Sequence, residues 1–279
     1  MKIFELNLPK LRYSEFIEEI TEYITRPVSW DRSHARIIFT PNPEICLKTL
    51  EDREFLEILS QADYLTSDGI GLYIAYQIND STYHSFFTYF FLPYYIFNIL
   101  FRKKYLYEMY SDRICGSDIT SELLSFVQKE WIKIAIVDPY FPEDKGKIEA
   151  QKHFSSRLSE TFPDLKFEYH ILRDDNREEI FESLKNSDIE ICFATLGMKR
   201  QEMFCIDVRE KCPNIKLTLG VGSSFDYYTW FQKRAPKIWR DTWFEWLYRT
   251  FTSPNKLTRL RRIYQALIVF PIKVISNNK

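Results

Sequence analysis

Six short apolar segments, rich in β-branched and aromatic residues, recur along the chain and predict buried strands. They are Ala35–Thr40, Ala62–Ser67, Lys133–Val137, Lys166–Ile171, Ile189–Leu196 and Lys216–Val221. Helical patterns lie between them, over Asn42–Leu59, Glu143–Thr161, Arg177–Lys185 and Lys199–Glu210. Because strand and helix alternate, we expect an α/β protein with a Rossmann-like, mostly parallel sheet and helices on both faces.

Polar or glycine-containing clusters follow four of these six strands, at residues 40–44, 67–71, 196–202 and 220–226. Glycine is scarce, with 7 in 279 residues, whereas ordinary composition would give about 20. A chain this short of glycine is expected to keep it where no other residue fits. Ligands of open parallel sheets bind beyond the carboxyl ends of the strands, so we expect the four clusters to form one cleft.

The segment Ser81–Phe101 departs from this alternation, because its 21 residues include no Asp, Glu, Lys or Arg. Between Phe86 and Tyr110, 12 of 25 residues are aromatic. The length could nominally span a bilayer, but the tyrosines and the basic residues at 102–104 are more typical of the headgroup level. An interfacial or re-entrant segment, a buried insert and a true span stay open, as does packing on the domain or on a second copy.

The C-terminal segment from Lys233 to Lys273 carries ten basic and two acidic residues, a net charge of +8. Since the whole chain has a formal net charge of −1, the remainder carries −9. Tryptophans and other apolar residues recur among the charges at roughly helical spacing, which favours a membrane-surface or anion-binding role over a merely solvated helical face. We therefore expect an α/β catalytic domain over residues 1–232, with an aromatic insert at about 81–110, and a basic amphipathic appendage over 233–279.

Asp68 is a candidate for acid–base chemistry, because it follows a strand and precedes Gly69-Ile70-Gly71. A carboxylate in this position can accept a proton from a substrate hydroxyl, and the glycines let the backbone approach a ligand closely. The alternative is that Asp68 caps the following helix. Spacing alone does not separate the two interpretations.

Three other motifs could hold a polar or anionic ligand. The loop at 40–44 offers hydroxyl and amide groups stiffened by two prolines, or it is simply a turn and a helix start. The motif at 220–225 lacks the third glycine of a dinucleotide fingerprint, but its backbone N–H groups could bind a diphosphate and Asp226 a ribose or base, or Asp226 could cap a helix. Arg113 could pair with a phosphate, while Ser117 or Asp118 could cap the helix expected from residue 119 to 129.

Several other chemistries have no support in the sequence. It contains no metal-ligand spacing, no P-loop, no Gly-x-Ser-x-Gly and no Asp-x-Asp after an apolar strand. The five cysteines form no C-x-x-C pair and the first residues lack an apolar signal region, so we expect reduced core thiols in a cytosolic protein. The nearly balanced charge gives no nucleic-acid footprint.

Taken in order, these motifs resemble the WecG/TagA/CpsF group of bacterial glycosyltransferases, glycosyltransferase family 26. The matching residues are Thr40-x-Asn42-x-Glu44, Asp68-Gly-Ile-Gly71, Arg113-x-x-Gly116-x-Asp118, Leu196-Gly-x-x-x-Gln-Glu202, Gly220-Val-Gly-x-x-Phe-Asp226, Arg234-Ala-Pro236 and Glu245-Trp-Leu-Tyr-Arg249. The resemblance covers about Phe39 to Tyr264. Each motif alone is weak, whereas the ordered set is specific.

The resemblance implies an inverting hexosyltransferase of surface-polysaccharide or cell-wall polymer synthesis. Such an enzyme moves a sugar, of the N-acetylmannosamine, uronic acid or hexose type, from a UDP-sugar onto a polyprenyl-diphosphate-linked sugar. It would be peripheral or monotopic on an anionic membrane surface, at the cytoplasmic face of the plasma membrane, with the appendage touching the membrane and helping to close the site. No metal or other cofactor and no nucleic acid are expected, and a homo-oligomer is possible.

Carried over by position, the resemblance makes Asp68 the general base on the acceptor hydroxyl. The expected lining of the substrate pocket is Thr40, Asn42, Gly69, Gly71, Arg113, Gln201 and Glu202. The residues expected to hold the nucleotide are Gly197, Gly220, Gly222 and Asp226. Arginine's planar fork suits phosphate, and the arginines expected to meet the leaving diphosphate or the membrane are Arg234, Arg249, Arg259 and Arg262.

Three departures from the family pattern bear on the identity of the donor. They are Asp-Pro-Tyr-Phe-Pro at 138–142 in place of a glycine-rich turn, Met-Lys-Arg at 198–200, and Ser223 in place of a common glycine. The aromatic stretch at 81–110 is also longer than expected. Two alternatives from other classes are a nucleotide-dependent oxidoreductase, against which the missing third glycine argues, and a non-catalytic membrane scaffold of a polysaccharide assembly complex.

Overall fold

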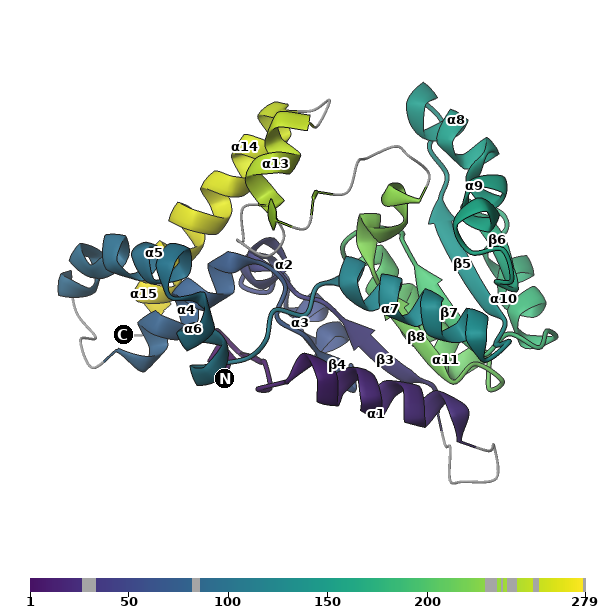
Figure 1. Ribbon diagram of the computed structural model, residues 1–279, viewed down its shortest axis with the longest axis horizontal. Helices are drawn as coiled ribbons and strands as arrows, with labels where there is room; N and C mark the ends of the chain where they lie inside the picture. The colour runs from purple at the N-terminus through teal and green to yellow at the C-terminus, as the bar shows by residue number, and fades with distance from the viewer. Residues whose placement is uncertain are drawn as a thin grey trace.

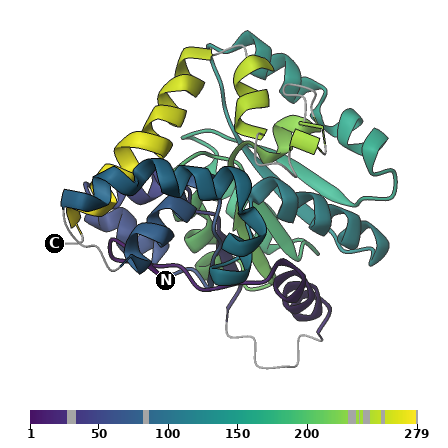
Figure 2. The ribbon, with the colours of Figure 1, turned by 60° about the vertical axis from the view of Figure 1, so that its left-hand side comes forward.

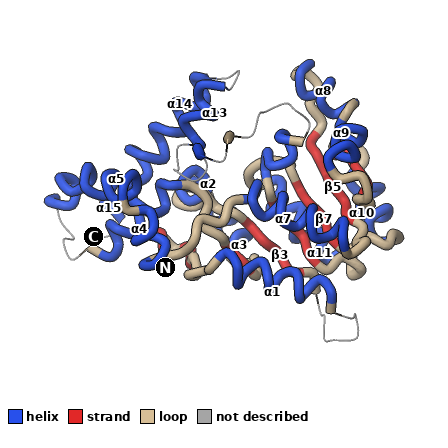
Figure 3. Tube along the Cα trace, viewed as in Figure 1, coloured by secondary structure: helices blue, strands red, loops and turns tan. Residues whose placement is uncertain are grey.

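The computed structural model describes residues 1–26, 34–81, 86–228, 235–236, 238–239, 245–252 and 256–277. Its centre is a six-stranded sheet in the order β4-β3-β8-β7-β5-β6, in which every neighbouring pair is parallel (Figures 1 and 3). The strands are β3 (Arg36–Phe39), β4 (Tyr64–Leu65), β5 (Ile134–Pro139), β6 (Phe167–Leu172), β7 (Ile191–Ala194) and β8 (Leu217–Gly220). The predicted α/β class and all six predicted strands are confirmed. A small antiparallel hairpin of β1 (Lys2–Ile3) and β2 (Leu6–Asn7), which was not predicted, precedes the sheet.

Alternate side chains of the central strands enter two separate hydrophobic cores, one on each face of the sheet. In β7, Cys192 and Ala194 belong to one core and Ile191 and Phe193 to the other, and all four are fully buried. This is the period-two arrangement that a strand imposes, and helices on both faces exclude water from it. One face is covered by α1 (Tyr13–Thr25), α7 (Gly116–Lys129) and α9 (Phe154–Thr161), and the other by α3 (Arg53–Leu59), α10 (Arg177–Lys185) and α11 (Arg200–Lys211) (Figure 2).

Two helices predicted as continuous are each divided in the structure. The segment 42–59 forms α2 (Pro43–Lys48) and α3, because the Asp52 side chain accepts from the Phe55 N–H at 3.0 Å and starts a new helix. The segment 143–161 forms α8 (Lys145–Lys152) and α9, which meet at His153. The predicted caps of α7 are wrong: Cys115 occupies the cap position, so Ser117 and Asp118 lie inside the first turn.

The aromatic insert forms a helical layer on α4 (Ile70–Asp80). It consists of η1 (Phe86–Phe91), α5 (Leu92–Phe101) and α6 (Lys103–Met109). In Figure 1 this layer lies at the side of the molecule away from β5 and β6. None of the helices in the described part of the chain combines the length and apolarity needed to cross a bilayer.

The C-terminal segment is helical where it is described, in α13 (Glu245–Thr252), α14 (Lys256–Tyr264), the π-helical turn η3 (Gln265–Val269) and α15 (Phe270–Asn277). α15 packs against α4, and Phe270 is fully buried in the same core as the sheet. Phe270 also makes an edge-to-face contact with Phe4, with ring centroids 5.9 Å apart. The last helix is therefore part of the main core, and the predicted division at residue 232 stays a prediction.

All five cysteines are buried and none forms a disulfide, as the sequence predicted. Burial raises the pKa of the Cys46 thiol to about 12 and that of the Cys212 thiol to about 11. A thiol with such a pKa stays protonated and unreactive near neutral pH. Four of them act as small apolar side chains of the core, whereas Cys115 lies at the cleft wall and donates to Asp118.

Candidate functional site

A cleft of about 500 Å³ opens beyond the carboxyl ends of the strands. Thr40 lies in it after β3, Asp68 after β4, Thr195 after β7 and Gly222 after β8, while Asp138 comes from the end of β5 itself. The volume suits a small-molecule or nucleotide ligand. Ligands of parallel α/β sheets bind at this edge, so the cleft is the candidate site.

Most of the predicted site residues line this cleft. They are Thr40, Asn42, Asp68, Gly69, Arg113, Gly197, Gln201, Gly222, Asp226, Arg259 and Arg262. Gly71, Glu202 and Gly220 lie behind the cleft wall. Arg234 lies outside the described residues, as does the side chain of Arg249. The roles assigned to these residues stay predictions, but the geometry brings the sequence-distant ones together.

Asp68 is held at the cleft by the backbone on either side of it. Its own N–H donates to the Pro41 carbonyl at 3.1 Å, and the preceding Ser67 carbonyl accepts from the Ile114 N–H at 3.1 Å. Helix α4 starts at Ile70 with Gly69 at the cap position, so Asp68 precedes the cap and is not itself the cap residue. Gly69 has a φ of +95°, a conformation that favours glycine.

Asn42 combines the two roles considered for its loop. Its side-chain oxygen accepts from the Ile45 N–H at 3.0 Å and caps α2, and the residue also lines the cleft. Glu44, two residues later, pairs with Arg262 of α14 at 3.4 Å. This ion pair joins the C-terminal segment to the loop after β3 across the mouth of the cleft.

Gln201 links the loop after β8 to α11. Its Oε1 accepts from the Gly222 N–H at 3.0 Å and its Nε2 donates to Glu202 Oε1 at 2.8 Å. A Cβ atom on Gly220 would lie 3.1 Å from the Gln201 Nε2, so the glycine leaves room for the amide. Gly71 has a similar packing role, since its Cβ would lie 2.6 Å from Pro43 Cγ and 2.7 Å from the Ala266 carbonyl oxygen. Both glycines allow close packing behind the cleft wall, and their predicted contact with ligand stays a prediction.

Lys147, on the first turns of α8, is a cleft residue that the sequence analysis missed. Its Nζ lies 2.6 Å from Asp226 Oδ1, and both side chains are more than four-fifths buried. Burial raises the pKa of Asp226, while the charge of Lys147 opposes the rise. No motif surrounds Lys147; the only cue was the unusual turn at 138–142, which precedes α8.

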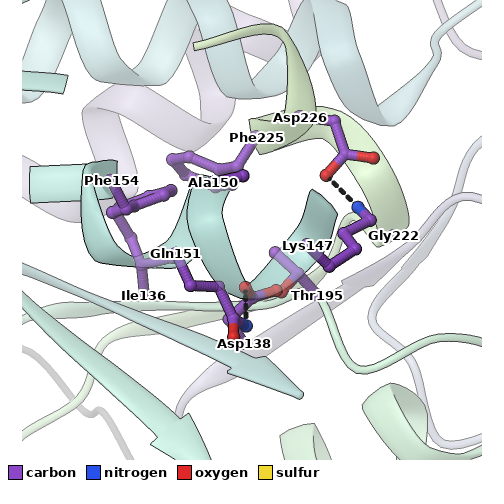
Figure 4. Close-up of a pocket in the computed structure, with 10 residues that line it drawn as sticks. All are labelled: Ile136, Asp138, Lys147, Ala150, Gln151, Phe154, Thr195, Gly222, Phe225 and Asp226. Carbon is purple, nitrogen blue, oxygen red and sulfur yellow. Dashed lines mark hydrogen bonds and ion pairs between the residues drawn. The ribbon is translucent and has the colours of Figure 1, made fainter. Parts of the chain in front are cut away.

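Figure 4 shows how this ion pair is placed beside Asp138. Asp138 accepts from Gln151 Nε2 at 2.7 Å, from the Tyr169 hydroxyl at 2.8 Å and from Thr195 Oγ1 at 2.5 Å. The bond from Gln151 holds α8 against the end of β5, and the other two fix Asp138 against β6 and the loop after β7. They therefore fix the direction from which the Lys147 ammonium reaches the cleft.

The cleft gathers positive charge from three parts of the chain. Arg113, which lies 3.8 Å from Asp118 in an ion pair, comes from the segment before α7. Lys147 comes from α8, and Arg259 and Arg262 from α14. Among the described side chains, no three His, Cys, Asp or Glu residues gather closely enough to hold a metal ion. The walls also carry the carboxylates of Glu44, Asp68, Asp138 and Asp226, so the cleft offers both cationic and anionic groups to a polar ligand.

A parallel Rossmann-like sheet with charged side chains gathered beyond its carboxyl edge is the arrangement of many enzymes that bind nucleotides and phosphorylated ligands. A family model described as Glycosyl transferase WecG/TagA/CpsF family matches residues 1–87 and 98–279. The chain belongs to this family, as the ordered motifs predicted. It is thus a glycosyltransferase of polysaccharide biosynthesis, with a nucleotide-sugar donor and a sugar acceptor. Membership favours a transferase over the oxidoreductase and scaffold alternatives.

Replacing Lys147 should weaken nucleotide binding. We expect Lys147→Gln to raise the Kd of a nucleoside diphosphate, measured by calorimetry, by about tenfold or more, because a hydrogen bond to a charged group contributes roughly 1.5–3 kcal/mol. Lys147→Arg should keep most of the affinity. Lys152→Gln, an exposed lysine of the same helix, is the matched control.

Lys147→Gln also leaves Asp226 buried without its cation, so stability must be separated from binding. The double variant Lys147→Gln/Asp226→Asn should recover thermal stability but not affinity. Wild-type affinity in that stable double variant would show that Lys147 does not contact the ligand.

Glu202 should make the stability of the protein depend on pH. It is fully buried, and within the described residues no hydrogen-bond partner reaches its Oε2. Burial raises its pKa, while the bond from Gln201 opposes the rise. The folded state then binds more protons than the unfolded state above the ordinary Glu pKa of about 4.3, so stability falls as pH rises from there through the raised value.

The check is chemical denaturation of wild type and Glu202→Gln at a series of pH values. The difference in unfolding free energy between them should shift in favour of Glu202→Gln as pH rises through that window. A difference that stays constant from pH 4 to pH 8 would show that Glu202 titrates alike in both states.

Proposed function

We propose that the protein is an inverting hexosyltransferase that moves a sugar from a UDP-sugar onto a polyprenyl-diphosphate-linked sugar, for a surface polysaccharide or cell-wall polymer. The observation that carries the proposal is the shared cleft, where the Asp68 carboxylate lies on the same walls as Arg113, Lys147 and Arg259. Such a site can receive a neutral hydroxyl at one point and a diphosphate at another. An inverting transfer by single displacement needs both a place for the acceptor hydroxyl and a place for the diphosphate of the donor.

In the proposed reaction, Asp68 accepts the proton of the acceptor hydroxyl as the oxygen attacks the anomeric carbon. The new glycosidic C–O bond forms on the face opposite the leaving group, while the bond from the anomeric carbon to the diphosphate oxygen breaks. The electron pair of that bond leaves with UDP, and the configuration at the anomeric carbon inverts. The loop after β4 supports this role, since two backbone hydrogen bonds fix the main chain at Asp68, which lines the cleft.

The leaving UDP gains negative charge, which the site must stabilise. We propose that the side chains of Arg113, Lys147, Arg259 and Arg262 supply this stabilisation without a metal ion. The Lys147–Asp226 pair supports the proposal, because a largely buried ammonium interacts more strongly with a developing anion than a fully solvated one does. The sugar-specific contacts are then left to the loops after β3 and β7.

We further propose that the enzyme works at the cytoplasmic face of the plasma membrane as a peripheral protein. The acceptor is then anchored in the bilayer by its polyprenyl chain. α14 supports this location, since its exposed Leu257 and Leu260 lie among Arg259, Arg261 and Arg262. The same helix thus offers one set of residues to the cleft and another to an anionic surface.

Asp68→Asn should lower kcat by roughly 10²–10⁴-fold, because a neutral amide cannot take the proton. Binding of the donor, measured by calorimetry, should stay near the wild-type value. The assay is sugar transfer to a short-chain polyprenyl-diphosphate sugar with a panel of UDP-sugars. Asp174→Asn, an exposed carboxylate outside the cleft, is the matched control, and a kcat of Asp68→Asn equal to that of wild type would remove Asp68 from the base role.

Transfer activity should persist after dialysis against a chelator. The expectation follows from the four cationic side chains of the cleft, which supply the charge that a divalent ion would otherwise supply. The measurement is initial rate in EDTA against initial rate with added Mg²⁺ or Mn²⁺. Activity that vanishes in EDTA and returns with the metal would contradict the metal-independent mechanism.

A further inference from the structure

The outer face of α5 exposes an unusual number of aromatic rings. Phe101 is 70% exposed, Tyr94 50% and Phe97 49%. Phe90, in the preceding 3₁₀ turn, is also 70% exposed. Contiguous exposed apolar surface of this kind marks a site of interaction in a folded protein.

The opposite face of α5 is fixed to α4 by a buried polar network. This attachment leaves the exposed aromatic rings on the side of α5 that faces away from α4. Asn98 Nδ2 donates to Gln77 Oε1 at 2.8 Å, and Gln77 Nε2 donates to the Tyr95 carbonyl at 3.2 Å. Asn98, Gln77 and the Tyr95 side chain are each at most 6% exposed. Turning α5 over would bury the aromatic face but leave these amides without their partners, at a cost of about 1–3 kcal/mol for each.

Most of the aromatic face lies outside the residues that the family model matches. The family model matches residues 1–87 and 98–279 but leaves out 88–97, the stretch that holds Phe90, Tyr94 and Phe97. The catalytic cleft has no residue in this stretch. We therefore expect the rings to contact a binding partner particular to this chain, and to have no part in the reaction that the family shares.

The charges around the face favour a lipid surface over a second copy of the chain. No charged residue occurs from Ser81 to Phe101, and Arg102, Lys103 and Lys104 follow at once. The Lys104 side chain is 91% exposed. Tyrosine and phenylalanine with a basic rim suit the headgroup region of an anionic bilayer, whereas a two-fold contact through this face would bring its own basic rims together.

The position of α5 also suits a lipid-linked substrate. α5 packs on α4, which begins two residues after Asp68, and α4 also packs on α15 and η3. The part of the cleft nearest these helices is apolar, with Ile70, Ile263 and Leu267 on its wall. A bilayer against α5 would thus lie beside the apolar side of the cleft.

We propose that the outer face of α5, formed by Phe90, Tyr94, Phe97 and Phe101 with the basic rim at 102–104, docks on the headgroup region of an anionic bilayer. This interaction is separate from that of the C-terminal helices. The proposal names a surface for the membrane location given in the proposed function. It rests on the proposed function for its biological purpose, but the vesicle-binding test does not depend on transferase activity.

The experiment measures co-sedimentation of the full-length protein with vesicles of phosphatidylglycerol and phosphatidylcholine, and with phosphatidylcholine alone. We expect the triple variant Tyr94→Ser/Phe97→Ser/Phe101→Ser to bind the vesicles with an apparent affinity at least tenfold lower than that of wild type. Arg102→Gln/Lys104→Gln should reduce binding to the anionic vesicles only. Trp131→Ser/Tyr140→Ser removes two exposed rings elsewhere on the surface and should bind as wild type does.

Two measurements keep the result interpretable. Phe97→Leu/Phe101→Trp should retain binding, because it keeps the apolar surface, and the triple serine variant should keep wild-type transfer to a water-soluble acceptor. Wild-type vesicle binding by the triple serine variant would overturn the inference. The inference would also be overturned if the triple serine variant changed its oligomeric state, measured by analytical ultracentrifugation, while its vesicle binding stayed unchanged. That result would assign the face to a second copy of the chain. Failure of wild type itself to transfer any sugar would instead count against the proposed function.

Discussion

The parallel pairing of β3 with β8 at the centre of the sheet is the constraint on which the site depends. The register places Phe39 opposite Gly220, so the loops that follow these two residues leave the sheet side by side. Residues about 180 positions apart in the sequence thereby share one edge, and Gln201 closes the arrangement by bonding to the Gly222 N–H. A slip of one residue would turn every side chain of the strand to the opposite face of the sheet, and the different sets of side chains buried in the two cores oppose it.

The sequence was sufficient for the sheet and for most of the cleft. Buried strands of a parallel sheet are nearly continuous apolar runs, and their carboxyl ends lie at the same edge of the sheet. Asp68 and Asp226 could therefore be placed at one edge from the sequence alone. Lys147 could not be found in this way, because its place in the cleft comes from the attachment of α8 to β5 through Gln151 and from the ion pair with Asp226. Likewise, the roles of Gly71 and Gly220 depend on neighbours from other parts of the chain, which local spacing does not reveal.

The aromatic insert shows a similar limit. Its composition left open a surface at a membrane, a buried element and a span. In the structure one face of α5 is buried, at Tyr95 and Ile99, and the other is exposed, at Phe97 and Phe101. The period of the helix separates these two sets, and the bonds of Gln77 to Asn98 and to the Tyr95 carbonyl help to determine which set faces the protein. A small polar network in an apolar layer thus favours one orientation of the helix over the other.

The burial of Phe270 has a consequence for how the polypeptide is made. α4 is synthesised early, yet part of its apolar surface is covered by α15, about 200 residues later. A nascent chain on the ribosome must therefore hold that surface uncovered until residue 277 has left the exit tunnel. During this interval the exposed surface is open to chaperones and to premature association, so translation speed and chaperone supply become determinants of yield.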